Sequence, residues 1–124
     1  MPFLSKNPSG YIRAKNEEEL YYFLENQYFP KKFGNNWEKQ FEFAPSCIID
    51  YFVKANIPIL IEVKNWFLRI KDMQQIMKYL AHATDRYGPK GFHFILIAGG
   101  IEEQRRTLLE PLGVEIIETK NILS

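Results

Sequence analysis

The sequence has a single cysteine, Cys47, among its 124 residues, so an intrachain disulfide is excluded. We therefore expect a protein of a reducing, intracellular compartment whose fold is held by a hydrophobic core rather than by crosslinks. No apolar run approaches the roughly 18 residues that a membrane span needs. The N-terminus also lacks the charged and then apolar pattern of a secretory signal. These absences argue against a disulfide-rich secreted domain and against a membrane protein.

An excess of either charge is also missing. Sixteen lysine and arginine residues face 15 aspartate and glutamate residues, for a formal net charge of +1. This balance neither requires nor excludes nucleic acid as a partner, because acids elsewhere can offset a local basic patch. Apolar residues, in contrast, are abundant: 46% of the chain is hydrophobic and 15% is aromatic. We expect one globular domain over residues 1–124.

The order of the predicted elements indicates an α/β fold. Residues 1–15 contain two prolines and a glycine after Met1 and are predicted as an irregular arm; Asn16 then caps a first helix that should end before Pro30. The following elements are predicted at Trp37–Phe43, Cys47–Val53 and Ile57–Lys64 (strands), about Ile70–Arg86 (helix), Gly91–Ala98 (strand), Glu102–Leu109 (helix) and Val114–Glu118 (strand). The sequence thus predicts a mixed central sheet flanked by helices, in the order α-β-β-β-α-β with a further C-terminal helix and strand.

The third predicted strand has the composition of a buried strand but ends with an acid and a base. Glu62 and Lys64 are two residues apart, so both project from the same face of a strand. Burying such groups costs several kcal/mol unless something compensates them. The two side chains therefore either lie at a wet edge of the sheet or serve chemistry.

The preceding strand places a second acid close to the first. If the hairpin is centred on Asn56, paired residues have numbers that add up to twice that number, and Asp50 lies opposite Glu62. Cross-strand neighbours have Cβ atoms about 4.5–5.5 Å apart, a distance at which carboxylates repel and a Mg²⁺ or Mn²⁺ ion would remove the repulsion. A shift of one residue in the loop would instead move Asp50 to the other face. Acids in this pattern also occur by chance on solvated faces.

With Asp50 on a second strand and Glu62-x-Lys64 on a third, the sequence resembles the PD-(D/E)xK nuclease superfamily. The resemblance covers roughly Asn16 to Ala98 and implies a restriction-endonuclease-like core. The chain departs from the pattern at Ile49, where the motif usually has proline.

A further match lies on the second predicted helix. RecB-like nucleases, a subset of the superfamily, carry QxxxY there, and this sequence reads QIMKY from Gln75 to Tyr79. Residues four apart share a helix face. However, the glycine that this subset places before the strand-two aspartate is missing, and Gln74 competes with Gln75 for the match. A helical tyrosine at this spacing is also more often a core residue.

The first predicted helix opens with three consecutive glutamates. Many superfamily members have a glutamate on this helix, and the run Glu17, Glu18, Glu19 and Leu20 resembles the pattern of archaeal Holliday-junction resolvases. Glu17 shares the core-facing side with Leu20, so it is the first candidate ligand and Glu18 the second, whereas Glu19 should face solvent. The alternative is that all three only interact with the positive end of the helix.

The resemblance implies a metal-dependent hydrolase of phosphodiester bonds in DNA. One or two Mg²⁺ or Mn²⁺ ions would activate a water molecule, and Lys64 would orient the nucleophile or stabilise the transition state. The implied catalytic residues are Asp50, Glu62, Lys64, Glu17 and Gln75, and the implied metal ligands are Asp50, Glu62, Glu17 and the Val63 carbonyl.

Basic residues before and after the acidic strands could follow a DNA backbone without reading its sequence. These residues are Arg13, Lys15, Lys31, Lys32, Arg69, Lys71 and Lys78. Each of them, taken alone, also fits an ordinary solvated charge.

Three functions are open at this point. The first is a nuclease that acts on DNA; the second is a non-catalytic nucleic-acid-binding or assembly module with a nuclease-like fold; the third is an α/β ligand-binding protein with incidental acids. The joint presence of Asp50, Glu62 and Lys64 argues against the second. The small size favours a homodimer that presents two sites, with residues 91–98 and Trp66–Phe67 as candidate interface segments.

Overall fold

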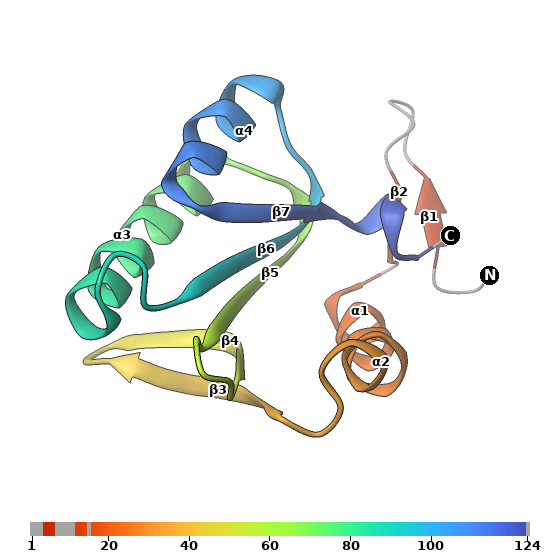
Figure 1. Cartoon of the computed structure of the whole chain (residues 1–124). Helices are drawn as coiled ribbons and strands as arrows, with labels where there is room; N and C mark the ends of the chain where they lie inside the picture. The colour runs from red at the N-terminus through yellow and green to blue at the C-terminus, as the bar shows by residue number, and fades with distance from the viewer. Residues whose placement is uncertain (1–3, 7–11, 15, 124) are drawn as a thin grey trace.

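The computed structural model describes residues 4–6, 12–14 and 16–123. Its centre is a mixed sheet with helices on both faces (Figure 1). Helices α3 (Ile70–Tyr87) and α4 (Glu103–Leu109) cover one face, and α1 (Glu17–Phe23) and α2 (Phe29–Phe33) lie on the other. None of the described helices is long and apolar enough to cross a membrane.

The sheet has five strands in sequential order. They are β3 (Trp37–Ala44), β4 (Cys47–Val53), β5 (Ile59–Phe67), β6 (His93–Gly100) and β7 (Val114–Glu118). The first three strands pair antiparallel, and β5, β6 and β7 pair in parallel through connections that contain α3 and α4. The predicted α-β-β-β-α-β core with a further helix and strand is thus confirmed. Short 3₁₀ turns at Glu110–Leu112 and Thr119–Asn121 flank β7.

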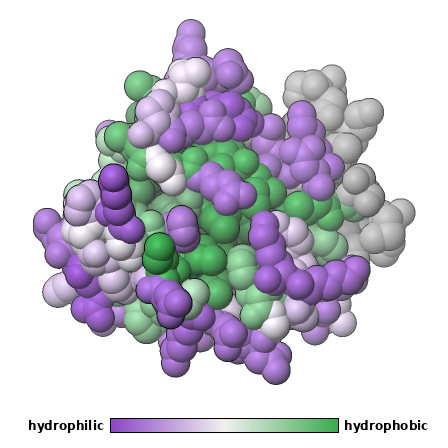
Figure 2. Space-filling model, viewed as in Figure 1, coloured by the Kyte–Doolittle hydropathy of each residue, from purple (hydrophilic) through white to green (hydrophobic). Residues whose placement is uncertain are grey.

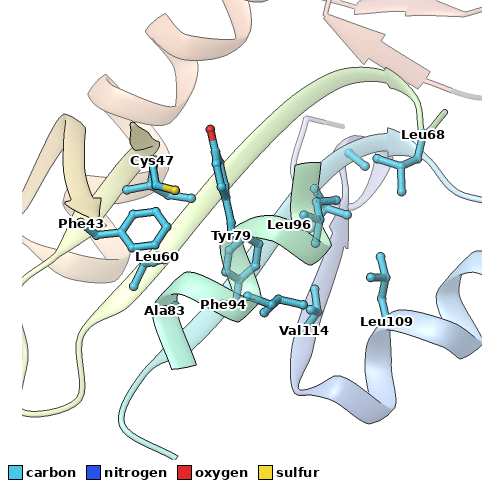
Figure 3. Close-up of a cluster of buried hydrophobic side chains, with 14 of the residues drawn as sticks. Phe43, Cys47, Leu60, Leu68, Tyr79, Ala83, Phe94, Leu96, Leu109 and Val114 are labelled. Carbon is cyan, nitrogen blue, oxygen red and sulfur yellow. The ribbon is translucent and has the colours of Figure 1, made fainter. Parts of the chain in front are cut away.

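The sheet carries a hydrophobic core on each face. One core, shown in Figure 3, packs against α3 and α4 and includes Phe43, Leu60, Phe94 and Leu109. The other packs against α1 and α2 and includes Leu20, Phe29, Tyr51 and Ile61. In the view of Figure 2, apolar residues gather in the middle of the molecule and hydrophilic residues surround them. Because β6 is buried on both faces, its neighbouring Leu96 and Ile97 contribute to opposite cores.

The hairpin between β4 and β5 has the register predicted from Asn56. Tyr51 pairs with Ile61, Phe52 with Leu60 and Val53 with Ile59. The numbers in each pair add up to twice the number of the central residue. Extending this register by one residue places Asp50 opposite Glu62.

The prediction that the first helix ends before Pro30 is wrong. Helix α1 continues through a π-helical turn, η1 (Leu24–Tyr28), into α2. Proline normally breaks a helix because it lacks an N–H group and its ring clashes with the carbonyl four residues earlier. Here the wider turn precedes it, with the Phe29 N–H donating to the Leu24 carbonyl, so Pro30 stands in the first turn of α2, where its missing N–H group costs least.

Two further expectations differ from the structure. The described parts of the arm that was predicted to be irregular form short antiparallel strands, β1 (Leu4–Lys6) and β2 (Ile12–Ala14). The expected role of residues 91–98 at a dimer interface is wrong, because β6 lies between β5 and β7 and both of its edges are paired.

Candidate active site

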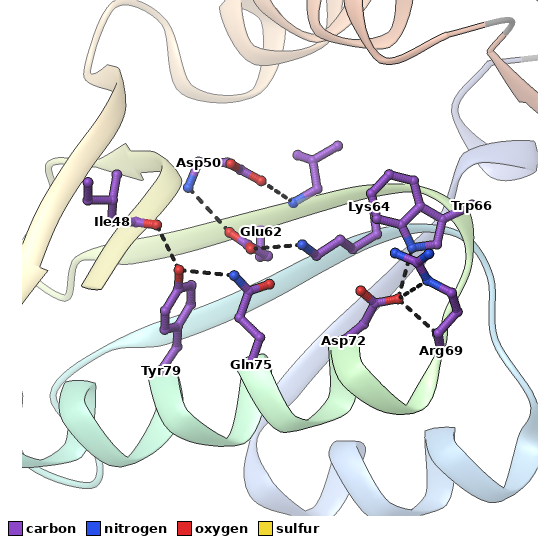
Figure 4. A network of polar contacts seen from close by, with 10 residues as sticks. Ile48, Asp50, Glu62, Lys64, Trp66, Arg69, Asp72, Gln75 and Tyr79 are labelled. Carbon is purple, nitrogen blue, oxygen red and sulfur yellow. Dashed lines mark hydrogen bonds and ion pairs between the residues drawn. The ribbon is translucent and has the colours of Figure 1, made fainter. Parts of the chain in front are cut away.

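Two carboxyl groups lie side by side just beyond the last paired residues of β4 and β5 (Figure 4). The Asp50 N–H group donates to Glu62 Oε1 at 3.4 Å, and the Val63 N–H group donates to Asp50 Oδ2 at 2.8 Å. Each carboxyl group therefore accepts a backbone hydrogen bond from the opposite strand. The Glu62 residue is only 2% exposed. The structure thus brings the two predicted acids together, with Glu62 buried and Asp50 half-buried.

The surroundings of the two carboxyl groups raise the pKa of both. Burial and the Asp50 charge raise the pKa of Glu62 from 4.5 to about 8, although the Lys64 charge opposes this rise. Burial also raises the pKa of Asp50, against the hydrogen bond from Val63. A hydrogen bond between the two side chains favours the charged form of Asp50 and the protonated form of Glu62. The site therefore contains more potential negative charge than its surroundings neutralise.

A lysine lies next to the pair, on the same strand as Glu62. The Lys64 Nζ atom is 3.4 Å from Glu62 Oε2, and most of the lysine side chain is buried. Both residues project from the same face of β5, as their spacing predicts. The amine is thus held beside the acids and directed toward them (Figure 4).

The QxxxY residues of α3 form a link between this helix and β4. The Gln75 Nε2 group donates to the Tyr79 hydroxyl at 3.2 Å, and that hydroxyl donates to the Ile48 carbonyl at 3.1 Å. Burial and then the charge of Glu62 raise the pKa of Tyr79, which indicates that this link lies close to the acid pair. Gln74, in contrast, is exposed. Of the two adjacent glutamines, Gln75 is therefore the one that faces the site.

The first-helix glutamates do not join the acid pair. Among the described residues, no three or more His, Cys, Asp or Glu side chains gather closely enough to hold a metal ion. Glu17 is half-buried, and its charge, after burial and the charge of Asp50, raises the pKa of Tyr21. The expected third ligand, Glu17, is therefore near the pair but not grouped with it.

The other two glutamates of that run also differ from each other. Glu18 is exposed and lines a cavity beside Asp50. Glu19 was expected to face solvent, but its Oε2 atom is buried and has no hydrogen-bond partner within the described part of the chain. Its backbone N–H group donates to the Asn16 side chain at 2.8 Å, which completes the predicted helix cap.

The cavity beside Asp50 contains residues that the sequence analysis missed. It has a volume of about 390 Å³ and is lined by Glu18, Tyr21, Tyr22, Glu25, Lys39, Gln40, Asp50 and Tyr51. Glu25 accepts a hydrogen bond from the Tyr51 hydroxyl at 2.6 Å and lies 3.6 Å from Lys39 Nζ. Its only signal in the sequence is its position seven residues after Glu18, on the same helix face. Three acids against one lysine make this cavity acidic.

A second hollow lies on the other side of the acid pair. It has a volume of about 350 Å³ and is lined by Lys64, Trp66, Arg69, Lys71, Asp72 and Gln75. Trp66 and Asp72 were not predicted as site residues. The lining of this hollow is basic, in contrast to that of the first cavity.

The predicted DNA-binding residues are divided between the two helical layers. Arg69, Lys71 and Lys78 lie at or on α3, whereas the exposed Lys31 and Lys32 lie on α2, across the sheet. Arg13 lies in β2, and Lys15 lies outside the described residues. Of the five predicted residues on the two helical layers, Arg69 and Lys71 line the hollow next to Lys64.

Comparison with known proteins relates the fold to three endonuclease structures. A repair endonuclease from Pyrococcus abyssi superimposes with a TM-score of 0.63 and 21% identity, over 85% of this chain and 47% of that chain. The EndoMS-dsDNA2 complex superimposes with a TM-score of 0.61 and 20% identity, over 82% of this chain and 43% of that chain. EndoMS in its apo form superimposes with a TM-score of 0.55 and 21% identity, over 85% of this chain and 46% of that chain.

These likenesses concern the fold, because the identities are low. The chain spans less than half the length of each of these three proteins. No protein-family model and no curated protein matches the chain.

Proposed function

We propose that this chain is a metal-dependent nuclease of the PD-(D/E)xK superfamily that hydrolyses phosphodiester bonds in DNA. The observation that carries the proposal is the pair formed by the half-buried Asp50 and the buried Glu62, with Lys64 beside it. The similar fold of repair endonucleases, one of them in a complex with double-stranded DNA, supports DNA as the substrate.

The acid pair fits a hard divalent cation, Mg²⁺ or Mn²⁺. Glu62 is buried and Asp50 is half-buried, and the raised pKa of Glu62 indicates that the pair lacks a second positive charge. Mg²⁺ is commonly held by one or two carboxylates and keeps several water molecules, so a third acid is not required. Asp50, Glu62 and the Val63 carbonyl would hold the ion, with Glu17 on the approaching helix. When bound, it would lower the pKa of a water molecule and stabilise negative charge on the phosphate.

The neighbouring side chains would orient the reactants. The Lys64 amine is held 3.4 Å from Glu62 and would donate hydrogen bonds to a phosphate oxygen or to the attacking water. Gln75 is fixed by its hydrogen bond to the Tyr79 hydroxyl, which donates in turn to the Ile48 carbonyl of β4. Its side chain would contact the substrate or the attacking water from the side of α3. The restricted mobility of both groups favours a single reactive arrangement.

The test is cleavage of labelled DNA in the presence of Mg²⁺ or Mn²⁺. We expect the wild-type chain to cleave, and we expect EDTA, Asp50→Asn or Lys64→Met to lower the rate by at least about 100-fold. Asp85→Asn is the matched control, because Asp85 is an exposed acid near the far end of α3. Cleavage that survives both Asp50→Asn and Lys64→Met would show that the site is wrong. DNA binding without cleavage by a folded wild-type chain would favour the non-catalytic module instead.

Metal binding has a readout that does not depend on activity. A ligand that binds only the folded state raises the melting temperature. We therefore expect Mn²⁺ to raise the melting temperature of the wild-type chain and of Asp85→Asn, but not of Asp50→Asn. The proposal also includes a homodimer, because a domain of this size offers little surface to DNA.

A further inference from the structure

A tryptophan, an arginine and an aspartate form a fixed group next to the candidate active site (Figure 4). The Asp72 residue is 3% exposed, and its Oδ2 atom accepts three hydrogen bonds. They come from the Trp66 Nε1 group at 2.8 Å, the Arg69 backbone N–H group at 2.9 Å and the Arg69 Nε group at 3.3 Å. The Arg69 guanidinium carbon lies 4.7 Å from the centroid of the Trp66 ring.

This group contains more than a helix cap requires. The bond from the Arg69 backbone to Asp72 is sufficient to cap α3. The structure adds an indole below the guanidinium and a second bond from the arginine side chain, although that side chain remains 51% exposed. An exposed arginine is normally mobile, and holding it in one orientation reduces the entropy that a ligand must overcome on binding. The Arg69 side chain is therefore held in one orientation while about half of it stays exposed to solvent.

The charge of the surrounding hollow fits an anion. Lys64, Arg69 and Lys71 line it, and the only acid in the lining is Asp72. Burial alone would raise the pKa of Asp72, but its hydrogen bonds and the Arg69 charge lower it, so this carboxylate is ionised and occupied by its three donors. The hollow thus presents positive charge to solvent.

The hollow also adjoins the acid pair through Lys64. The Lys64 Nζ atom lies 3.4 Å from Glu62 Oε2 and 5.6 Å from the centroid of the Trp66 ring. Lys64, Trp66 and Arg69 therefore form a row that leads away from the acids. On the opposite side, the cavity that includes Asp50 is acidic and would repel a phosphate.

We propose that this basic hollow binds the phosphate next to the scissile one along the DNA strand, with Arg69 as its main contact. Trp66 and Asp72 are positioning residues that hold the guanidinium. The inference rests on the proposed nuclease function and adds a direction to it: the strand leaves the acid pair over Lys64 toward Arg69, away from the acidic cavity.

The first experiment compares Arg69→Gln with Arg86→Gln in DNA binding, measured by fluorescence anisotropy in EDTA at several salt concentrations. Arg86 is the matched control, because it is an exposed arginine at the other end of α3 whose guanidinium lies 5.4 Å from the centroid of an aromatic ring, that of Tyr87. We expect Arg69→Gln to weaken binding about tenfold and to reduce the salt-dependence slope by about 1. Arg86→Gln should change neither quantity.

The second experiment identifies the phosphate that Arg69 contacts. Oligonucleotides are prepared with a single neutral methylphosphonate at each position around the cut. Arg69→Gln should no longer weaken DNA binding when the neutral group replaces the phosphate directly next to the cut on one side, because the contact is then already absent. Neutral groups at the other positions should leave the effect of Arg69→Gln unchanged. If Arg69→Gln weakens binding equally with every oligonucleotide, the proposed contact does not exist.

The positioning role is tested with Asp72→Asn and Trp66→Phe. Both variants weaken the contacts that hold the guanidinium without removing its charge, so we expect KM to rise severalfold while kcat stays within about twofold. Arg69→Lys should lie between the wild type and Arg69→Gln. Melting temperatures identify any variant that is unfolded. If Asp72→Asn and Trp66→Phe are unfolded, the intermediate KM expected for Arg69→Lys is the deciding result.

The outcomes separate this inference from the proposed function. If the wild-type chain neither binds nor cleaves DNA, both proposals fail. If it cleaves DNA and Arg69→Gln behaves like Arg86→Gln, only the phosphate subsite is wrong.

Discussion

At the scale of single residues, Glu62 carries the largest electrostatic cost of the site. It is 2% exposed, lies against Asp50 and has one cation, Lys64, within ion-pair distance in the described structure. Removing a carboxylate from water is unfavourable, so burial favours the protonated form of Glu62 and raises its pKa in the folded chain.

This cost predicts how stability depends on pH. The pKa of Glu62 rises from 4.5 in the unfolded chain to about 8 in the folded one. Between these values the folded state binds more protons, so the free energy of unfolding should fall as pH rises, by up to about 1.4 kcal/mol per pH unit. Glu62→Gln cannot titrate and should lose this part of the slope. The measurement is urea denaturation in EDTA from pH 5 to pH 8.

Glu115→Gln is the control for that experiment, because Glu115 is an exposed acid on β7 and should leave the pH profile unchanged. If the free energy of unfolding fell equally with pH in the wild type and in Glu62→Gln, the raised pKa of Glu62 would be contradicted.

At the scale of elements, one tyrosine of α3 links this helix to β4 through a hydrogen bond. The Tyr79 hydroxyl accepts a hydrogen bond from Gln75 and donates one to the Ile48 carbonyl, while its ring packs against Phe43 with centroids 5.6 Å apart. The hydroxyl therefore connects the helix to the strand that carries Asp50. The ring contact packs the same helix against the neighbouring strand β3, which carries Phe43.

Tyr79→Phe separates these two contributions. The ring contact remains, but the Ile48 carbonyl and the Gln75 amide lose their partner, so we expect a loss of about 1 to 3 kcal/mol in the free energy of unfolding. Tyr22→Phe is the control, because Tyr22 is exposed on α1. Urea denaturation at one pH measures both variants. If Tyr79→Phe were as stable as the wild type, the hydroxyl would not contribute to the link between α3 and β4.

At the scale of the whole molecule, two cores share a single sheet. The interior strand β6 places Leu96 in one core and Ile97 in the other, so neither core is complete without it. A two-sided sheet of this kind should unfold as one cooperative unit. This expectation agrees with the prediction of a single domain over residues 1–124.

The two tryptophans test this cooperativity. Trp37 lies 5.6 Å from Phe29 between ring centroids, against the core beneath α2, whereas Trp66 lies near the end of β5 and donates a hydrogen bond to Asp72 of α3. In Trp66→Phe and Trp37→Phe, the remaining tryptophan reports on one side of the sheet. Within each variant, the fluorescence and far-UV circular dichroism midpoints in urea should coincide. Different midpoints in either variant would indicate two independent units.

Part of the site could be predicted because it depends on local geometry. The alternation of side chains on a strand places Glu62 and Lys64 on one face, and the hairpin centre alone defines the partner of each residue in β4. The helical period likewise places Gln75 and Tyr79 on one face of α3. None of these relations requires knowledge of the rest of the molecule.

The sequence by itself determined the order of the helices and strands from the first helix onward, the register of the β4–β5 hairpin and the residues that lie at its acidic end. Only the tertiary structure decided that the helix continues through Pro30, that Glu25 lines the acidic cavity, and that Trp66 and Asp72 hold Arg69. The physical reason is the range of the interactions. Periodicity and turn geometry act between residues close in the chain, whereas burial and helix-to-sheet contacts depend on which distant segments pack together.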